Sequence, residues 1–464
     1  MKKKRILKTP IIFVFLGLII LFLSPFILSW ITKTMVSMID GFQVRVQWMN
    51  QSEVIGGHPH LQFYLSQEVA NDDLNKSFYI QPETEGTWQW LEDDLVIWTP
   101  DGYLEPGQMI HFGFNQEKSS DENIKSIQWQ AFIRHPKIVY LKSVEGGKEL
   151  FKVPSDATVP VRQITNTDGI VEDFTISPDG EQILAVLGNE QSGIDLWLMD
   201  RDGENLKLLL DCGLDRCANP SWNPVRDEIV FTIEKHRFVN DQPGWDLPNV
   251  YLLNLVSGIT QPLATDENAI GFDPVWSSKG QWVTIWKGVD QGIEILHAST
   301  GQPVYRDAGS DDTGCWSPDE RYFYYSNVRE EGMPIVSIIY QLEILSTQRT
   351  FFTGSELVNL GNNYYYPICH PEGEGVATVV QVDPLIPQRE LWWIKVDSTY
   401  QKIFDDLSLM VTQFRWSPDG SKAIFLQDTL MGLADGSRIG LWDAGAPDEK
   451  QVFEDQVFKL EWLP

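Results

Sequence analysis

A short stretch that ends in a proline-containing turn recurs along this 464-residue chain, and its spacing limits the folds that the chain can adopt. The copies are FTISPDGEQILAV (174–186), PSWNPVRDEIVFT (220–232), PVWSSKGQWVTIW (274–286), GCWSPDERYFYYS (314–326), PICHPEGEGVATV (367–379) and FRWSPDGSKAIFL (414–426). The proline position falls at 178, 224, 278, 318, 371 and 418, with a serine at 278, so the copies lie 40 to 54 residues apart. A period of this length indicates one supersecondary unit repeated along the chain.

Each copy is followed by further short segments in the same order. IDLWLMDRDGE (194–204) and NVYLLNLVSG (249–258) are examples of the apolar run that ends in a hairpin. Such β-branched, leucine and aromatic runs, bounded by Gly, Asp, Asn and Ser, are typical of short strands. Four antiparallel strands in about 40–50 residues form a β-propeller blade. The pattern therefore predicts an all-β fold.

The two ends of the repeat region complement each other. Residues 136–165 match the second, third and fourth strands of a blade without its first strand. The chain stops at VFKLEWLP (457–464), where Trp462 and Pro464 match the indole and proline of the other first strands. Pairing these segments would complete a seventh blade and remove exposed sheet edges. We predict a seven-bladed propeller over 136–464 with split closure between its N- and C-terminal strands.

The W-S-P-D-G turn, complete at 416–420, resembles the repeat of TolB-type (WD40-like) β-propellers. The resemblance extends over about residues 136–464. It implies the fold rather than one activity, because such blades occur in TolB, in tricorn-type proteins and in the propellers of prolyl-oligopeptidase-family enzymes. Asn223, Ser278 and the HPEG segment at 370–373 depart from the motif, so no family partner site is transferred to this chain.

The acidic residues of the turns are candidates for catalysis, but their repetition favours a structural role. Asp179, Asp319 and Asp419 occupy the same turn position once per blade, so they would be spread around the ring rather than face one bond. Pro, Asp and Gly in this order are turn formers. The tryptophans before the turns recur in the same way, and we expect them to pack between neighbouring blades.

The N-terminus carries the signal for the membrane. Residues 1–8 (MKKKRILK) form a basic tail, and residues 9–32 contain no charged side chain. This apolar segment is long enough to span a bilayer and longer than the apolar region of a cleaved signal peptide. We predict a single-pass signal anchor with a cytoplasmic N-terminus, which places the bulk of the chain outside the cytoplasm, in the bacterial cell envelope.

The charge of the chain disfavours nucleic acid as a partner. Six of its 36 basic residues precede the first acidic residue, Asp40. The rest of the chain therefore contains 30 basic and 65 acidic residues. Such a polyanion repels phosphate backbones.

Between the anchor and the repeats, residues 42–135 have a different pattern. They resemble the bacterial Ig-like domains of surface-layer and other exported proteins, with Phe78, Ile80 and Pro82 in an F-x-I-x-P strand and an L-x-P-G corner at 104–107. The resemblance implies an Ig-like β-sandwich, a fold that commonly serves as a spacer.

The four cysteines occur in two settings. Cys212 and Cys217 lie five residues apart in DCGLDRC, which favours a disulfide in an oxidising compartment. Cys315 and Cys369 fall in first strands at adjacent repeat positions, so they should point to opposite faces, and we expect buried free thiols.

Insertions between the second and third strands are the best candidates for recognition, because loops vary freely while the blades position them. They lie at 234–249, 327–338, 381–390 and 427–438 and should gather on one face. Arg237, Phe238 and Trp245, in the longest insertion, are the predicted partner-binding rim. Tolerated insertions without a function are the alternative.

The sequence favours a binding or scaffold protein whose propeller face engages a protein, peptide or glycan of the envelope. It contains no G-x-S-x-G nucleophile elbow and no helix-rich stretch for an appended hydrolase domain. We expect no cofactor, no metal and no catalytic residues, and an enzyme is the less favoured reading. The alternative is a propeller hydrolase or lyase, acting on sugars or peptides with residues gathered at the central channel.

Overall fold

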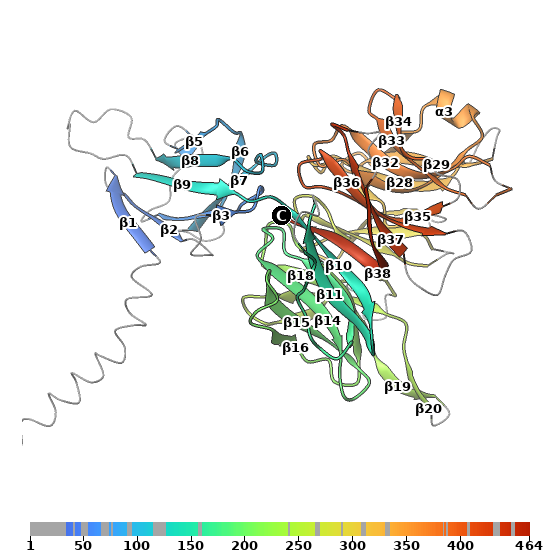
Figure 1. Cartoon of the computed structure of the whole chain (residues 1–464), viewed down its shortest axis with the longest axis horizontal. Coiled ribbons are helices and arrows are strands. Elements are labelled where there is room, and N and C mark those ends of the chain that lie inside the picture. The colour runs from blue at the N-terminus through green and yellow to red at the C-terminus, as the bar shows by residue number, and fades with distance from the viewer. Residues whose placement is uncertain are drawn as a thin grey trace, which may run out of the picture. The chain divides into compact units, whose positions relative to one another are not determined.

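The computed structural model describes residues 34–39, 42–47, 54–65, 74–75, 78–90, 95–114, 127–155, 160–239, 242–264, 270–288, 291–307, 312–329, 335–383, 385–386, 388–405, 409–429, 437–446 and 451–464. The chain folds into two compact units, Met1–Arg134 and His135–Pro464, which consist mainly of strands (Figure 1). The predicted cytoplasmic tail (1–8) and membrane helix (9–32) lie outside the described residues. Within the described ranges, no helix has both the length and the apolar character that a bilayer span requires.

The first unit contains two sheets that enclose one core. The first sheet has the order β1 (Thr34–Ile39), β2 (Phe42–Gln47), β4 (Leu61–Leu65), β7 (Leu95–Pro100), β6 (Gly86–Trp90), and the second the order β3 (Val54–Ile55), β9 (Ile127–Ile133), β8 (Met109–Phe114), β5 (Phe78–Gln81). Alternate residues of β8, Ile110, Phe112 and Phe114, are fully buried, as the two-residue period of a strand requires. Phe114 meets Phe63 of the other sheet with 5.2 Å between ring centroids. The two sheets therefore share one aromatic core.

The second unit repeats a group of four antiparallel strands, which we call a blade and name by its first strand. The first strands and their partners are β13 (Val171–Ile176), β14 (Gln182–Gly188), β15 (Ile194–Asp200), β16 (Lys207–Leu210); β17 (Arg216–Trp222), β18 (Glu228–Glu234), β21 (Asn249–Asn254), β22 (Thr260–Pro262); and β23 (Phe272–Trp276), β24 (Trp282–Trp286), β25 (Ile293–His297), β26 (Pro303–Asp307). They continue with β27 (Cys315–Trp316), β28 (Tyr322–Val328), β29 (Ser337–Glu343), β30 (Gln348–Phe351) and β31 (Asn363–Cys369), β32 (Gly375–Gln381), β33 (Glu390–Lys395), β34 (Tyr400–Phe404), with the short helix α3 (Ser355–Asn359) between these two blades. The central strands are continuous apolar runs, such as the buried 183–187, because both of their faces are covered.

The last strand joins the two ends of this unit. After β35 (Leu409–Trp416), β36 (Lys422–Thr429) and β37 (Ser437–Asp443) comes the 13-residue β38 (Gln451–Leu463). Its first half pairs with β37, for example Gly440 with Val452. Its second half pairs with β10 (Lys137–Val144), which continues to β11 (Gly147–Pro154) and β12 (Arg162–Gln163). One sheet thus contains strands from the start and the end of the unit.

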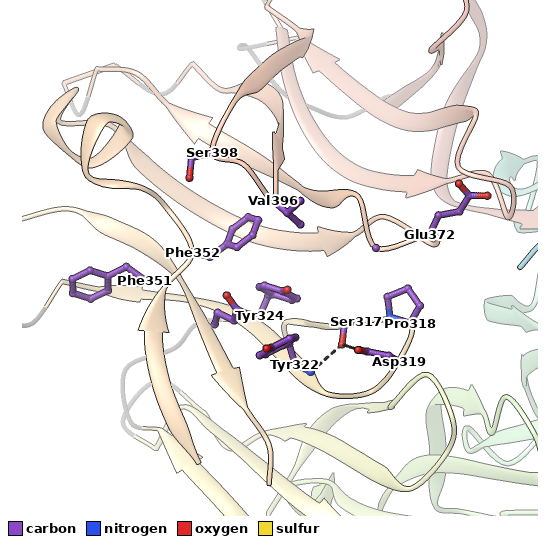
Figure 2. Close-up of a pocket in the computed structure, with 12 residues that line it drawn as sticks. Ser317, Pro318, Asp319, Tyr322, Tyr324, Phe351, Phe352, Glu372, Val396 and Ser398 are labelled. Carbon is purple, nitrogen blue, oxygen red and sulfur yellow. Dashed lines mark hydrogen bonds between the residues drawn. The ribbon is translucent and has the colours of Figure 1, made fainter. Parts of the chain in front are cut away.

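The repeated aspartates are turn residues, as predicted. In the β27 blade, Ser317 Oγ donates to Asp319 Oδ1 at 2.6 Å (Figure 2). The backbone N–H of Arg321 donates to the same oxygen at 3.1 Å. The same serine–aspartate bond occurs at Asp179 (2.6 Å) and Asp419 (2.5 Å). The carboxylate therefore organises the turn between the first and second strands.

Four of the five repeated tryptophans bond to the preceding blade, which supports their predicted packing, whereas the buried indole nitrogen of Trp222 has no hydrogen-bond partner among the described residues. The indole N–H of Trp276 donates to the carbonyl oxygen of Ser221 at 3.0 Å, and that of Trp316 to Thr284 Oγ1 at 3.1 Å. Trp416 donates to the Ile368 carbonyl at 3.4 Å, and Trp462 to the Arg415 carbonyl at 3.2 Å. Each of these four indoles thus fills apolar space and satisfies its single donor across the boundary between blades.

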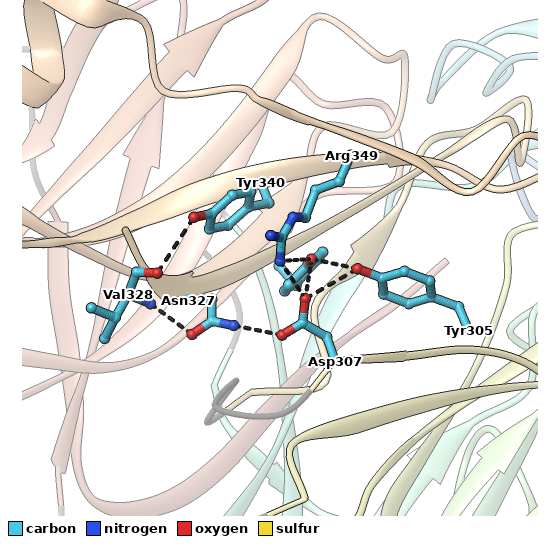
Figure 3. Close-up of polar contacts among 7 residues, drawn as sticks. Tyr305, Asp307, Asn327, Val328, Tyr340 and Arg349 are labelled. Atoms are coloured by element: carbon cyan, nitrogen blue, oxygen red, sulfur yellow. Dashed lines mark hydrogen bonds and ion pairs between the residues drawn. The ribbon is translucent and has the colours of Figure 1, made fainter. Parts of the chain in front are cut away.

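A buried carboxylate joins the β23 and β27 blades. Asp307, 7% exposed, accepts from the hydroxyls of Tyr305 (3.0 Å) and Tyr325 (2.6 Å). It also accepts from Asn327 Nδ2 at 2.6 Å and from the Arg349 guanidinium at 2.7 Å (Figure 3). Burial, with the neighbouring carboxylate second, raises the pKa of the Tyr325 hydroxyl, so Tyr325 stays a donor. We call these five residues the Asp307 cluster.

Candidate functional site

The first strands of the blades surround a cavity of about 820 Å³, which we call the channel cavity. It is lined by two rings of side chains, one from each first strand or its immediate start. The first ring is Asp173, Asn219, Asp273, Thr313, Tyr366, Gln413 and Lys459; the second is Thr175, Ser221, Val275, Cys315, Ile368, Arg415 and Glu461. This volume falls within the range of about 300–1,000 Å³ typical of ligand sites.

The two rings follow a simple rule in the sequence. Every member of the first ring lies five residues before the proline position of its repeat, and every member of the second ring lies three before it. Both positions line the cavity, and in several of the first strands a β-bulge lies at these positions. Our sequence reasoning counted the blades from this proline but did not read the offsets, and it therefore named no channel residue.

One arc of the cavity, formed by β35, β38 and β13, is a network of charges. Lys459 Nζ lies 2.7 Å from Asp173 Oδ1 and 3.4 Å from Glu461 Oε1, and it donates to the Phe174 carbonyl oxygen at 2.7 Å. Glu461 Oε2 in turn accepts from the backbone N–H of Ile176 at 3.2 Å. The network therefore ties the last strand of the chain to the first strand of the β13 blade.

The pKa shifts in this network follow from burial and pairing. Burial alone would lower the pKa of the Lys459 ammonium, but the carboxylates of Glu461 and Asp173 outweigh it and raise this pKa above 10.5. Burial raises the pKa of Glu461, and the positive charges of Lys459 and Arg415 offset only part of that effect. Lys459 is thus a fixed cation, and Glu461 protonates more readily than an ordinary glutamate.

Two polar residues of the channel cavity, Asn219 and Asp273, lie beside this charged arc. Asn219 donates through its side-chain amide to Asp273, and both have a positive φ, 50° and 44°. Burial raises the pKa of Asp273, although the Asn219 bond opposes the shift. The left-handed conformation is tolerated best by Asn and Asp among residues other than Gly, and the first strands of both blades carry a bulge here. The bulge turns these side chains into the cavity.

The opposite arc, from β23 to β31, carries apolar and aromatic side chains together with the buried Asp312 and with Thr313. Val275, Ile368 and Tyr366 line it, and Tyr366 is 51% exposed. Tyr366 has φ 52°, a strained value for an aromatic residue, and its backbone N–H donates to Asp312 Oδ2 at 3.3 Å. Backbone strain of this kind concentrates at functional sites. The channel cavity therefore combines a charged wall with an apolar wall.

Cys315 and Cys369 are joined by a disulfide with a Cα–Cα distance of 5.6 Å, so the expectation of free thiols is wrong. The two side chains do occupy opposite faces of their own sheets. Adjacent blades stack face to face, however. The side of the β27 sheet that carries Cys315 therefore packs against the side of the β31 sheet that carries Cys369. Opposite orientation on consecutive blades brings the two sulfurs together at the wall of the channel cavity.

The predicted rim residues lie on a hairpin of β19 (His236–Val239) and β20 (Gln242–Trp245) that projects from the unit (Figure 1). Phe238 is 70% exposed, and the Arg237 guanidinium pairs with Asp246 at 2.8 Å. Trp245 stacks on Arg216, whose guanidinium carbon lies 3.4 Å from the ring centroid, and its indole donates to the Leu214 carbonyl at 3.1 Å. The structure thus brings the hairpin to loop 212–217.

Loop 212–217 is itself closed by a disulfide. Cys212 and Cys217 are bonded, with a Cα–Cα distance of 6.3 Å. Asp215 within the loop accepts from the His236 backbone N–H at 2.8 Å and pairs with Lys235 at 2.8 Å. The base of the hairpin is therefore held on a covalently closed turn. None of the three rim residues, Arg237, Phe238 and Trp245, lines the channel cavity.

The described part of the chain contains no group of three or more His, Cys, Asp or Glu side chains placed to hold a metal ion.

The repeated blades and the ring of first strands define a β-propeller protein. Among solved structures, one from a study of two prolyl endopeptidases matches with a TM-score of 0.51 and 11% identity, over 70% of this chain and 49% of that chain. A puromycin-hydrolyzing peptidase of Mycobacterium tuberculosis matches with a TM-score of 0.50 and 11% identity, over 71% of this chain and 55% of that chain. The chain thus spans about half the length of these enzymes, and the likeness concerns the fold.

TolB from Acinetobacter baumannii is also similar, with a TM-score of 0.43 and 11% identity over 86% of each chain. No family model and no curated protein sequence matches this chain. The fold is an all-β β-propeller, and a second all-β unit precedes it in the chain.

Proposed function

We propose that this protein is a membrane-anchored, extracytoplasmic binding protein that engages a polypeptide partner through its propeller. One observation carries the proposal: the channel cavity is open, amphipathic and already organised. Its charged side chains are bound to one another, and its apolar wall presents a strained, exposed Tyr366. Ligand sites are typically apolar with a few fixed polar groups, and this cavity has that composition.

A polypeptide segment fits this chemistry better than a glycan. An apolar or aromatic side chain would pack against Tyr366, Val275 and Ile368. A polar terminus or a charged side chain would face Lys459 and Arg415 on the other wall. Because the charged groups already hold one another in place, binding would require little reordering.

The projecting hairpin supports a second contact with the same partner. Phe238 exposes an aromatic ring on a hairpin whose base is fixed by Asp215 and the Cys212–Cys217 disulfide. Exposed aromatic side chains on rigid elements are typical anchors of protein interfaces. Insertions between second and third strands leave the blades near the starts of the first strands, so this hairpin belongs to the face from which the first strands begin.

The proposal also assigns roles to the parts of the chain outside the binding site. The apolar segment 9–32 would anchor the chain with its basic tail in the cytoplasm. The first unit would be an Ig-like spacer, which its two-sheet organisation supports. The second unit would count seven blades, with β38, β10, β11 and β12 as the blade that closes the ring.

The test is affinity capture from the envelope fraction with the full-length chain in detergent, in three versions. The wild type should retain a defined protein, Tyr366→Gly should lose most of it, and Leu345→Ala, a change at an 87% exposed position in a hairpin, should retain it. Retention of nothing by the folded wild type, or equal retention by Tyr366→Gly, contradicts the proposal. Product formation from glycans or peptides that depends on Glu461 would favour an enzyme instead.

A further inference from the structure

A second cavity, of about 550 Å³, opens between the β27 and β31 blades and is separate from the channel cavity (Figure 2). One wall is formed by Tyr322 and Tyr324 of β28, Gln341 of β29 and Phe352, which follows β30. The facing wall belongs to the β31 blade and includes Glu372 and Ser398. We call this cavity the aromatic groove.

Three rings form the continuous aromatic wall. Tyr322 and Tyr324 lie two residues apart on one face of β28, with ring centroids 6.5 Å apart. Phe352 meets Tyr324 edge to face at 5.0 Å. Phe351, by contrast, turns to the other face of its strand, where it packs on Tyr340 at 5.4 Å. Phe351 also lines the cavity, but the ring-to-ring contacts of the wall join Tyr322, Tyr324 and Phe352.

The charged side chains of the aromatic groove are all acidic. Asp319 and Glu372 line it, both exposed, and no Lys, Arg or His is among the described residues that do. Burial would raise the pKa of Asp319, but its bonds from Ser317 and from the Arg321 N–H lower it, with the charge of Lys279. Asp319 is therefore ionised at neutral pH. Repulsion by the two carboxylates disfavours an anionic ligand.

The chain itself already places a cation on this wall. The Arg321 guanidinium lies 5.0 Å from the Tyr322 ring centroid, oriented by Glu343 at 2.8 Å. Arg321 is not among the residues that line the groove, whereas Tyr324 and Phe352 are. The rings are thus arranged as they are in cation–π contacts.

We propose that the aromatic groove binds an organic ammonium cation, whose positive charge faces Asp319 and Glu372 and whose alkyl surface packs on Tyr324 and Phe352. Aromatic faces attract ammonium groups through the ring quadrupole, and nearby carboxylates add to the attraction. The ammonium belongs either to a lysine side chain of a polypeptide or to a small quaternary ammonium molecule. Both share the chemistry that the groove recognises.

The test compares a cation with its neutral isostere on the full-length chain in dodecyl maltoside, a detergent without an ammonium group. Calorimetric titration with choline should give saturable binding, and 3,3-dimethyl-1-butanol, of the same shape without charge, should bind about tenfold more weakly or worse. A parallel titration with N-acetyl-lysine methylamide distinguishes a lysine source from a quaternary one. Equal binding of the neutral isostere, or no binding of either cation, overturns the proposal.

Variants locate the binding in the groove. Phe352→Leu keeps apolar volume but removes the π face, and Glu372→Gln removes one charge at an exposed position; each should weaken choline binding at least about fivefold. Phe458→Leu is the matched control, because it removes a 46% exposed ring that does not line the groove, and it should leave binding unchanged. If Phe352→Leu unfolds, Glu372→Gln still decides. An equal loss in Phe458→Leu, or no loss in Glu372→Gln, contradicts the assignment.

Discussion

Replacing Asp307 by asparagine should destabilise the propeller by about 3 kcal/mol. The carboxylate is 7% exposed and accepts four hydrogen bonds, one of them from the Arg349 guanidinium. Asparagine has the same shape, but its amide nitrogen presents donors where the cluster needs acceptors. Breaking a buried ion pair costs about 3–5 kcal/mol. We take the lower end because the Arg349 side chain is 25% exposed and regains some solvation.

The measurement is thermal unfolding of the full-length chain, with the propeller transition followed by calorimetry. At about 2 °C per kcal/mol for a unit of this size, Asp307→Asn should lower the midpoint by about 6 °C. Tyr305→Phe, which removes one donor, should lower it by about 2 °C, because a neutral hydrogen bond contributes about 1 kcal/mol. The double variant Asp307→Asn with Arg349→Met should be more stable than the sum of its single effects, because it leaves no unpaired charge. A shift of under about 2 °C for Asp307→Asn, or strict additivity, refutes this reasoning.

Three further predictions concern the channel and its supports. Replacing Cys315 and Cys369 together by serine should destabilise the protein by about 4 kcal/mol, and replacing Cys212 and Cys217 together by about 2 kcal/mol. The first value is larger because that disulfide spans 54 residues and the other spans five. Chemical denaturation of both double variants checks this order. Burial raises the pKa of Glu461 above its usual 4.5, so ionising it costs the folded state more than the unfolded state. Glu461→Gln should therefore gain stability relative to the wild type as pH rises above about 4.5, and a constant difference across that range would contradict this. Tyr366→Gly relieves a positive φ of 52° and should leave the unfolding midpoint equal or higher while it weakens partner capture, and a loss of both would assign the residue to the core instead.

The repeat predicted those features that depend on one blade and its neighbour. The proline position located the Asp319 turn, and the indole of Trp316 fell where it bonds to the preceding blade. Both depend on contacts that recur with the same local geometry in each unit. The proline position of each repeat also locates the channel residues, because Lys459 and Asp173 both lie five residues before it.

Other features depend on how consecutive blades stack, which strand patterns do not describe. Cys315 and Cys369 point to opposite faces, and only the stacking of two blades turns this into a bond. The residues of the Asp307 cluster do not belong to the repeated motif, so the repeat does not predict their contacts. The strained backbone of Tyr366 follows from a bulge that the alternation of apolar residues does not reveal.

The most direct test of the central claim, that the channel cavity binds a polypeptide, is site-specific photocrosslinking in intact membranes. A photoreactive phenylalanine analogue replaces Thr313, which lines the channel cavity, or Val256, which is 80% exposed at a hairpin turn outside its lining. The account predicts a discrete protein adduct from position 313 that mass spectrometry identifies, that disappears in the Tyr366→Gly background, and that position 256 does not give. Absence of an adduct at position 313 in the folded protein, or the same adducts from both positions, would contradict it.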